Sequence, residues 1–217
     1  MAKVGVVLSG SGYLDGSEIH EAVLTLLYLD KQGAEIVCMA PDAEQVRVVN
    51  HNTGKAASEK RNVLVEAGRI ARGKIRDVKN VSAKELDALI FPGGFGAALN
   101  LCTFAADGSS CSVNKDVEQL ITAMHASRKP IGFICIAPAV GARVLGKQSP
   151  KLTIGNDAGT AAALGKMGAV HKECRVDDIV TDEKNKIVST PAYMLGPSIA
   201  HVAKGIEKAV AKVIELI

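Results

Sequence analysis

The fold is indicated by residues 3–41, KVGVVLSGSGYLDGSEIHEAVLTLLYLDKQGAEIVCMAP. The first apolar run ends in Ser and Gly, which is typical of a buried parallel strand. Apolar residues then recur at helical spacing up to Gly33, and they predict a helix whose buried face consists of Ile19, Ala22, Val23, Leu26 and Leu27. AEIVCMA follows as a second strand, so the stretch predicts a βαβ unit.

Strands and helices alternate along the rest of the chain. LDALIFP and PIGFIC are expected strands with helices after them, and DIVTDEKNKIVST is an expected antiparallel hairpin. Because parallel crossovers are right-handed, this order predicts a doubly wound α/β sandwich with a mostly parallel central sheet and a small hairpin. No Pro- or Ser-rich linker divides the chain, so we expect one domain over residues 1–217, with an insertion around residues 45–85.

The composition excludes several classes of protein. The net charge is +3 and the basic residues are scattered, so we expect no nucleic-acid partner. The five cysteines are odd in number and lack a CxxC pair, which favours reduced thiols in the cytoplasm and predicts no metal site. The N-terminal apolar run is too short for a signal peptide, and no segment approaches a membrane span.

Three strand ends carry unusual residues. Ligands of doubly wound folds bind at the carboxyl ends of the strands, where the first strand is followed by SGSGYLDGSEIHE and a later one by FPGGFG. The strand PIGFIC ends on Cys135, just before the helix that begins near Pro138. We therefore expect Glu18, the glycine loop and Cys135 to meet at one edge of the sheet.

Cys135 has two interpretations. A buried cysteine can simply pack as a small apolar residue. Alternatively, a sharp strand-to-helix turn projects its side chain from the sheet as a nucleophile elbow, near a helix N-terminus that favours the thiolate. Pro138 suits the first turn of that helix.

Two other features fit a reactive thiol. The backbone N–H groups of Gly94 and Ile136 would form an oxyanion hole if the glycine loop faces Cys135, although Gly-Gly also occurs in ordinary tight turns. Glu18 would act as a general acid/base with a pKa raised by burial, or would only stabilise the first turn of its helix.

Four motifs together resemble one family. GSGYLDGSEIHE, IFPGGFGAALNL, PIGFICIAPA and IVSTPAYM are similar to the protein deglycase/PfpI superfamily, which has the class I glutamine amidotransferase-like fold, and most of all to its ElbB-type branch. The resemblance implies a flavodoxin-like sandwich, a homodimer, Cys135 as the elbow cysteine and Glu18 as its hydrogen-bonded acid. It also implies a cofactor-free, glyoxalase III-like activity on glyoxal or methylglyoxal.

The chain departs from other branches of that superfamily. Ile136 stands where PfpI-type proteases have a histidine, and PAYML lacks the His and Glu of glutamine amidotransferases. These departures disfavour peptidase and glutaminase activity. His20 is two residues from Glu18, so on a helix it would point about 200° away. Further residues expected at the pocket are Gly12, Gly93, His20, Asn156 and Tyr193.

The predicted reaction is the isomerisation and hydration of a small 2-oxoaldehyde, such as glyoxal to glycolate. Cys135 adds to the aldehyde, the Gly94 and Ile136 N–H groups hold the oxyanion, and Glu18 moves the proton through an enediol. Hydrolysis of the resulting thioester needs no cofactor. The alternatives are a thiol-based redox or electrophile sensor and a non-enzymatic dimeric binding protein with weak side activity.

Overall fold

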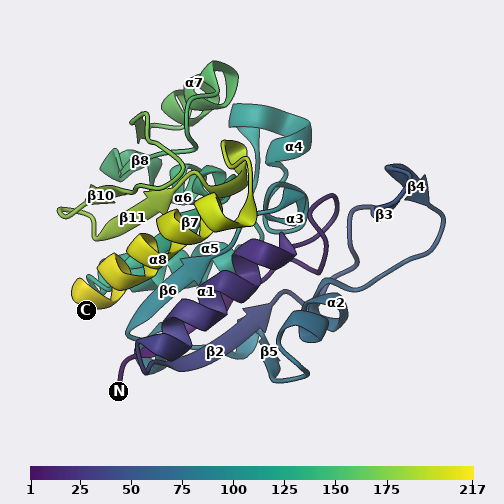
Figure 1. Cartoon of the computed structure of the whole chain (residues 1–217), viewed down its shortest axis with the longest axis horizontal. Coiled ribbons are helices and arrows are strands. Elements are labelled where there is room, and N and C mark those ends of the chain that lie inside the picture. Colours follow the sequence, from purple (N-terminus) through teal and green to yellow (C-terminus); the bar gives the residue numbers. More distant parts are fainter.

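The central feature of the computed structural model, which describes residues 1–217, is a seven-stranded sheet (Figure 1). Its order is β10-β11-β7-β6-β1-β2-β5, and every neighbouring pair is parallel except β10 with β11. The strands of this sheet are β1 (Lys3–Val7), β2 (Glu35–Ala40), β5 (Ile75–Asp77), β6 (Ala88–Phe91), β7 (Ile131–Ile134), β10 (Val180–Asp182) and β11 (Ile187–Thr190). The mostly parallel sheet and the antiparallel hairpin confirm the predicted fold class.

Helices cover both faces of this sheet. They are α1 (Ile19–Lys31), α2 (Val63–Ile70), α3 (Phe95–Leu99), α4 (Phe104–Asp107), α5 (Lys115–Ala126), α6 (Pro138–Leu145), α7 (Ala158–Lys166) and α8 (Ile199–Glu215). Helices α1, α2 and α8 share one face, and α1 lies beside α8 in Figure 1, whereas α3, α5 and α6 pack on the other face. Two short pairs lie outside the main sheet: β3 (Val48–Asn50) with β4 (Lys55–Ala57), and β8 (Lys151–Leu152) with β9 (Val170–His171).

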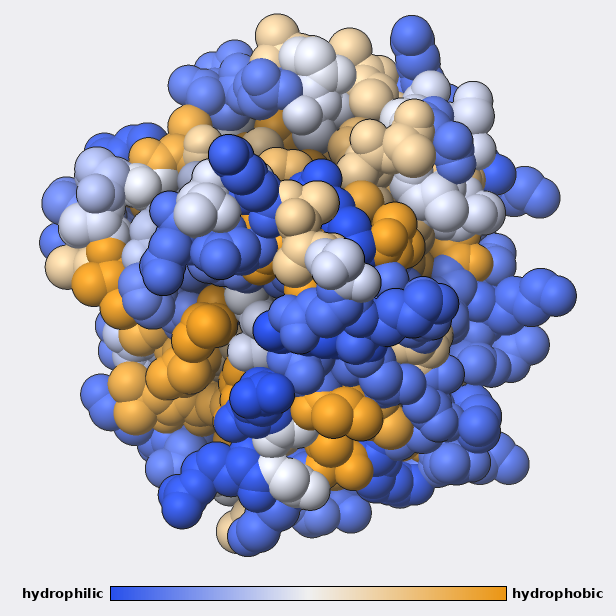
Figure 2. All heavy atoms as spheres, turned by 90° about the vertical axis from the view of Figure 1, so that its right-hand side faces the viewer, coloured by the Kyte–Doolittle hydropathy of each residue, from blue (hydrophilic) through white to orange (hydrophobic).

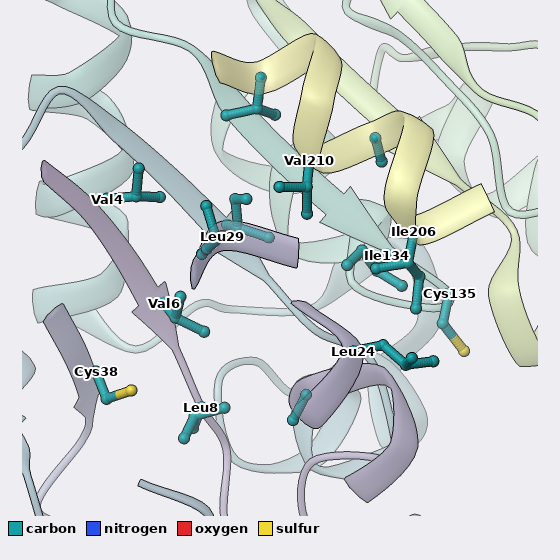
Figure 3. Close-up of a cluster of buried hydrophobic side chains, with 14 of the residues drawn as sticks. Val4, Val6, Leu8, Leu24, Leu29, Cys38, Ile134, Cys135, Ile206 and Val210 are labelled. Atoms are coloured by element: carbon teal, nitrogen blue, oxygen red, sulfur yellow. The ribbon is translucent and has the colours of Figure 1, made fainter. Parts of the chain in front are cut away.

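Side chains that alternate along the strands point into two separate hydrophobic cores. Val4, Val6 and Leu8 point from β1 into a cluster of 22 buried residues under α1 and α8, while Val7 points into a second cluster of 21 residues. Figure 3 shows the first cluster, in which Cys135 lies at the margin of the labelled side chains. The strand end that carries the thiol is therefore fixed by close packing from one side.

The buried face of α1 differs from the predicted one. Ile19, Val23 and Leu27 are 44%, 48% and 42% exposed, whereas Glu21 and Thr25 are fully buried. Ala22 is buried as predicted, and with Glu21, Leu24, Thr25 and Leu29 it forms the buried face, so the helix is rotated relative to its most apolar stripe. This rotation turns a carboxylate toward the sheet.

Residues 45–85 form two different structures. The β3–β4 ribbon projects from the body of the molecule on an extended loop (Figure 1). In contrast, α2 packs on β2, and β5 continues the central sheet as its edge strand. The later part of this segment therefore belongs to the main sheet.

The surface is mainly hydrophilic, with apolar patches between the charged side chains on the face shown in Figure 2. None of the helices combines the length and the hydropathy required to cross a lipid bilayer.

Candidate active site around Cys135

Three adjacent parallel strands end at the same edge of the sheet. Strand β6 pairs with β1 on one side and with β7 on the other, so the segments that follow them are neighbours. These segments contain the loop before α1, the glycine loop and Cys135. The structure thus brings together the three strand ends that the sequence singled out.

Cys135 occupies a strained turn between β7 and α6. Its φ of 61° lies in the left-handed region, which costs a residue with a side chain roughly 1 kcal/mol or more. Its N–H donates to the Thr190 carbonyl at 2.9 Å, and Pro138 begins α6 three residues later. This is the geometry of the predicted nucleophile elbow, and Pro138 has the predicted place in the first helical turn.

The glycine loop packs against the loop before α1. A Cβ on Gly94 would lie 2.3 Å from the Glu18 nitrogen, and Gly94 has a φ of 93°, so no other residue fits there without strain. The Glu18 N–H donates to the Gly93 carbonyl at 2.9 Å. A Cβ on Gly93 would lie 2.4 Å from the Cys135 Cβ and 2.7 Å from Glu21 Oε2, so Gly93 lets those two side chains come together.

Glu21 is the carboxyl group that lies beside the Cys135 thiol: both face Gly93, and each of the two groups alters the pKa of the other. It is fully buried in the first turn of α1, where its Oε2 accepts from the Gly93 N–H at 2.9 Å and its Oε1 from the Tyr193 N–H at 3.1 Å. Burial, and to a smaller extent the nearby Glu18 charge, raises the pKa of Glu21 to about 8, despite the lowering effect of these hydrogen bonds. Glu21 therefore exchanges its proton near neutral pH.

Glu18, which the sequence predicted as the partner of the thiol, has another position. It is the N-cap of α1, with extended backbone angles, and its Oε2 accepts from the Glu21 N–H at 2.7 Å. The capping bond draws this carboxylate toward the end of the helix, whereas Glu21 lies one turn farther along and faces the sheet. Glu18 still lines the cavity beside Cys135, and burial raises its pKa, as the sequence predicted.

The protonation state of Cys135 also differs from the expectation. Burial raises the pKa of this thiol well above its usual value, and the Glu21 charge raises it further. The N–H groups of Gly94 and Ile136 interact with the sulfur and lower its pKa, but they do not compensate for burial. The structure therefore holds a neutral thiol, because the helix N-terminus is outweighed by desolvation.

The Gly94 and Ile136 N–H groups lie near enough to the Cys135 sulfur to lower its pKa. The structure places both donors predicted for an oxyanion hole beside one reactive atom, although their action on a substrate stays a prediction. The Cys135 N–H donates to the Thr190 carbonyl, whereas the Ile136 N–H lowers the pKa of the sulfur.

A cavity of about 460 Å³ opens above the thiol. It is lined by Tyr13, Glu18, Gly94, Phe95, Ala98, Phe104, Ala105, Cys135, Ile136, Thr160, Tyr193 and Met194. A smaller adjoining opening is bounded by Tyr13, Glu18, His20 and Tyr193. The sequence did not predict the aromatic wall, because Phe104 comes from the short helix α4, which has no periodic signal.

Of the other predicted pocket residues, Tyr193 and His20 border the cavity or its adjoining opening, whereas Gly12 and Asn156 do not. Tyr193 lines the cavity, and its hydroxyl is 2.8 Å from His20 Nδ1. His20 does not point away from Glu18: Nδ1 lies 3.9 Å from Glu18 Oε1, because Glu18 precedes the helix and helical geometry does not apply to it. Gly12 packs against His51 outside the cavity lining, and Asn156 is exposed.

No group of three or more His, Cys, Asp or Glu side chains is arranged to hold a metal ion. No histidine lines the cavity above Cys135.

Similarity to known proteins identifies the family. No family model matches the chain. The human glutamine amidotransferase-like class 1 domain-containing protein 3 is 47% identical over 225 residues, covering 99% of this chain and 83% of the relative. The chain belongs to this amidotransferase-like family. In this family, an isoprenoid biosynthesis protein with an amidotransferase-like domain from Ehrlichia chaffeensis is 36% identical, with a TM-score of 0.93 over 100% of this chain and 99% of that one.

More distant structures share the fold of the amidotransferase-like family. Glyoxalase III from Candida albicans superposes with a TM-score of 0.64 at 15% identity, over 100% of this chain and 97% of its own. The fold is thus shared with an enzyme of the predicted class. The predicted cytoplasmic location is wrong, because the human relative and its rat and zebrafish counterparts are all named as mitochondrial proteins.

Proposed function

We propose that this protein is a cofactor-independent glyoxalase that converts 2-oxoaldehydes to 2-hydroxy acids at Cys135. The observation that carries the proposal is the contact between a buried thiol and a buried carboxyl group, with two N–H donors at the sulfur and a cavity above it. The fold shared with a glyoxalase III supports the reaction class.

The first step is addition of the thiol to the aldehyde. Glu21 in its carboxylate form takes the thiol proton as the S–C bond forms, and the carbonyl π electrons move to oxygen. In this proposal the Gly94 and Ile136 N–H groups, which lower the pKa of the sulfur, donate to this oxyanion. Glu21 then returns the proton to the oxygen, which gives a neutral hemithioacetal.

The second step is an internal oxidation and reduction. Glu21 removes the proton from the carbon bonded to sulfur and gives it to the neighbouring carbonyl oxygen, which forms an enediol. Glu21 then carries the hydroxyl proton of the first carbon to the second carbon, so the first carbon is oxidised and the second reduced by two electrons. The product is a thioester of a 2-hydroxy acid. Water cleaves this thioester and restores the thiol, so glyoxal and water give glycolic acid. A pKa near 8 suits Glu21 to act as both base and acid.

The two neighbouring carboxyl groups provide the test. We expect Glu21→Gln to lower kcat for glyoxal by about 10²–10⁴-fold, because the amide cannot transfer the proton. Glu18→Gln, the matched control, keeps the cap oxygen and lowers kcat less than about tenfold. Glycolate production is measured for both variants at pH 8. Full activity in Glu21→Gln would overturn the assignment.

The sensor alternative has less support. A redox or electrophile sensor requires an accessible thiolate, whereas Cys135 is buried and its pKa is raised. The homodimer stays a prediction, which light scattering of the purified protein would test. The exposed apolar stripe Ile19, Val23 and Leu27 of α1 is a surface that such a contact would cover.

A further inference from the structure

The cavity above Cys135 is much larger than glyoxal requires. Its volume of about 460 Å³ is in the range of sites that enclose drug-sized ligands, roughly 300–1,000 Å³. Nine of its twelve lining residues are hydrophobic. A two-carbon dialdehyde would leave most of this apolar wall without a contact.

The apolar wall comes from elements that do not hold the reacting groups. Phe95 and Ala98 belong to α3, and Phe104 and Ala105 belong to α4. Phe95 is fixed from outside the cavity by Arg47, whose guanidinium carbon lies 5.5 Å from the ring centroid. The apolar wall is therefore separate from the reacting groups, and its Phe95 ring is held by the Arg47 guanidinium.

The charge of the lining excludes anionic groups. No lysine, arginine or histidine lines the cavity, and the only ionisable carboxyl group in the lining is that of Glu18. A carboxylate or phosphate on the substrate would find no counter-charge there and would be repelled by Glu18. A neutral tail meets neither penalty.

We propose that the preferred substrate is a neutral 2-oxoaldehyde with an aryl or alkyl substituent of about six carbons or more. This inference rests on the proposed function and names its substrate class. The aldehyde carbon lies at Cys135, and the tail lies against Phe95, Ala98, Phe104 and Ala105. The reaction balances as for glyoxal, because the tail does not take part in it.

Burial of the tail gives the size of the effect. Each methylene removed from water contributes about 0.8 kcal/mol, so kcat/KM should rise about threefold to fourfold per methylene until the cavity is filled. Aryl groups gain further from edge or face contacts with the phenylalanine rings.

The test is a substrate series. We would measure kcat/KM for methylglyoxal, 2-oxohexanal, 2-oxooctanal and phenylglyoxal with wild type and Cys135→Ser. We expect phenylglyoxal and 2-oxooctanal to exceed methylglyoxal by at least about 30-fold, with all turnover lost in Cys135→Ser. If methylglyoxal is turned over through Cys135 and the larger aldehydes are not better substrates, the inference is overturned while the proposed function stands. If no aldehyde is turned over, the proposed function fails, and the inference fails with it.

Two neighbouring alanines on α4 give a matched pair of variants. Ala105 lines the cavity and is exposed at its edge, whereas Ala106 is exposed and lies outside the lining. We expect Ala105→Phe to lower the ratio of kcat/KM for phenylglyoxal to that for methylglyoxal by about tenfold, because the new ring occupies the tail space. Ala106→Phe should leave this ratio within about twofold. An unchanged ratio in Ala105→Phe, or an equal fall in both variants, would overturn the placement of the tail.

Discussion

Cys135 and Cys111 occupy contrasting environments, although both thiols are buried. Burial and the charge of Glu21 raise the pKa of Cys135, whereas the contact with the Cys102 thiol lowers the pKa of Cys111 to about 7. Yet Cys111 does not line the cavity, and its sulfur contacts Met167 Sδ at 3.8 Å. The thiol that we propose as the nucleophile is therefore not the one with the lower pKa: Cys135 is assigned because it lies beside a carboxyl group and lines a cavity.

The largest expected effect separates the two thiols directly. Cys135→Ala should lower glyoxal turnover by about 10⁴-fold or more, because no other group can form the thioester. Cys111→Ala should stay within about twofold of wild type. Steady-state glycolate production measures both. Equal losses in the two variants would mean that Cys111 takes part in the chemistry.

The next largest expected effect is a change with pH in the free energy of unfolding, which Glu21 causes beside Cys135. The folded-state pKa of Glu21, about 8, exceeds the ordinary value of 4.5, so the folded state holds an extra proton between these values. Its contribution to stability is therefore complete below about pH 4.5 and is lost as the pH rises to 8. Relative to Glu21→Gln, we expect the free energy of unfolding of wild type to fall by roughly 3–4 kcal/mol from pH 5 to pH 8. Urea unfolding at several pH values measures it, and parallel curves for the two proteins would contradict it.

The third prediction concerns the separation of the Cys135 thiol from the Glu21 carboxyl group. In Gly93→Ala the new Cβ would collide with Cys135 and Glu21, and a displacement of about 1 Å lowers kcat about 10²-fold. Gly165→Ala in α7 is the control, since an added Cβ there meets nothing within 4 Å. Turnover of glyoxal by the two variants is compared with circular dichroism to verify folding. Normal turnover in Gly93→Ala would show that the contact is dispensable.

The smallest effect is the pH dependence of the rate. We expect kcat/KM for glyoxal to rise about tenfold between pH 7 and pH 9, because Glu21 must be a carboxylate to take the thiol proton. A nucleophile with the pKa of Cys111 would instead give a rate that levels off just above pH 7. Initial rates over pH 6–9.5 distinguish the two profiles.

The sequence was sufficient to place the thiol. Buried strands followed by turns dictate the sheet, and Pro138 marks the helix that forms the elbow, so Cys135, Gly94 and Ile136 follow from local patterns. These features depend on residues adjacent in the chain, where turn chemistry is decisive.

The partner carboxylate was not predictable from the same patterns. The motif SEIHE contains Glu18 and Glu21, and the choice between them depends on the rotation of α1 against the sheet. Apolar periodicity favours the stripe with Ile19, Val23 and Leu27, but the face that is buried carries Glu21 and Thr25 beside Ala22, Leu24 and Leu29. A buried Glu is expensive unless it is hydrogen-bonded, and its donors, the Gly93 and Tyr193 N–H groups, are distant in sequence. The only indication of this buried face in the sequence was the spacing of Glu21 and Thr25, which places both on one side of a helix.

The hydrogen bond from the Tyr193 N–H to Glu21 has a consequence for synthesis of the chain. It joins a residue near the end of the sequence to the first helix, and the Cys135 N–H likewise depends on the Thr190 carbonyl. A ribosome that has made only the first 150 residues has already produced the thiol, the glycine loop and Glu21. The Tyr193 N–H and the Thr190 carbonyl emerge later, so the nascent chain carries the thiol before the proposed site can assemble.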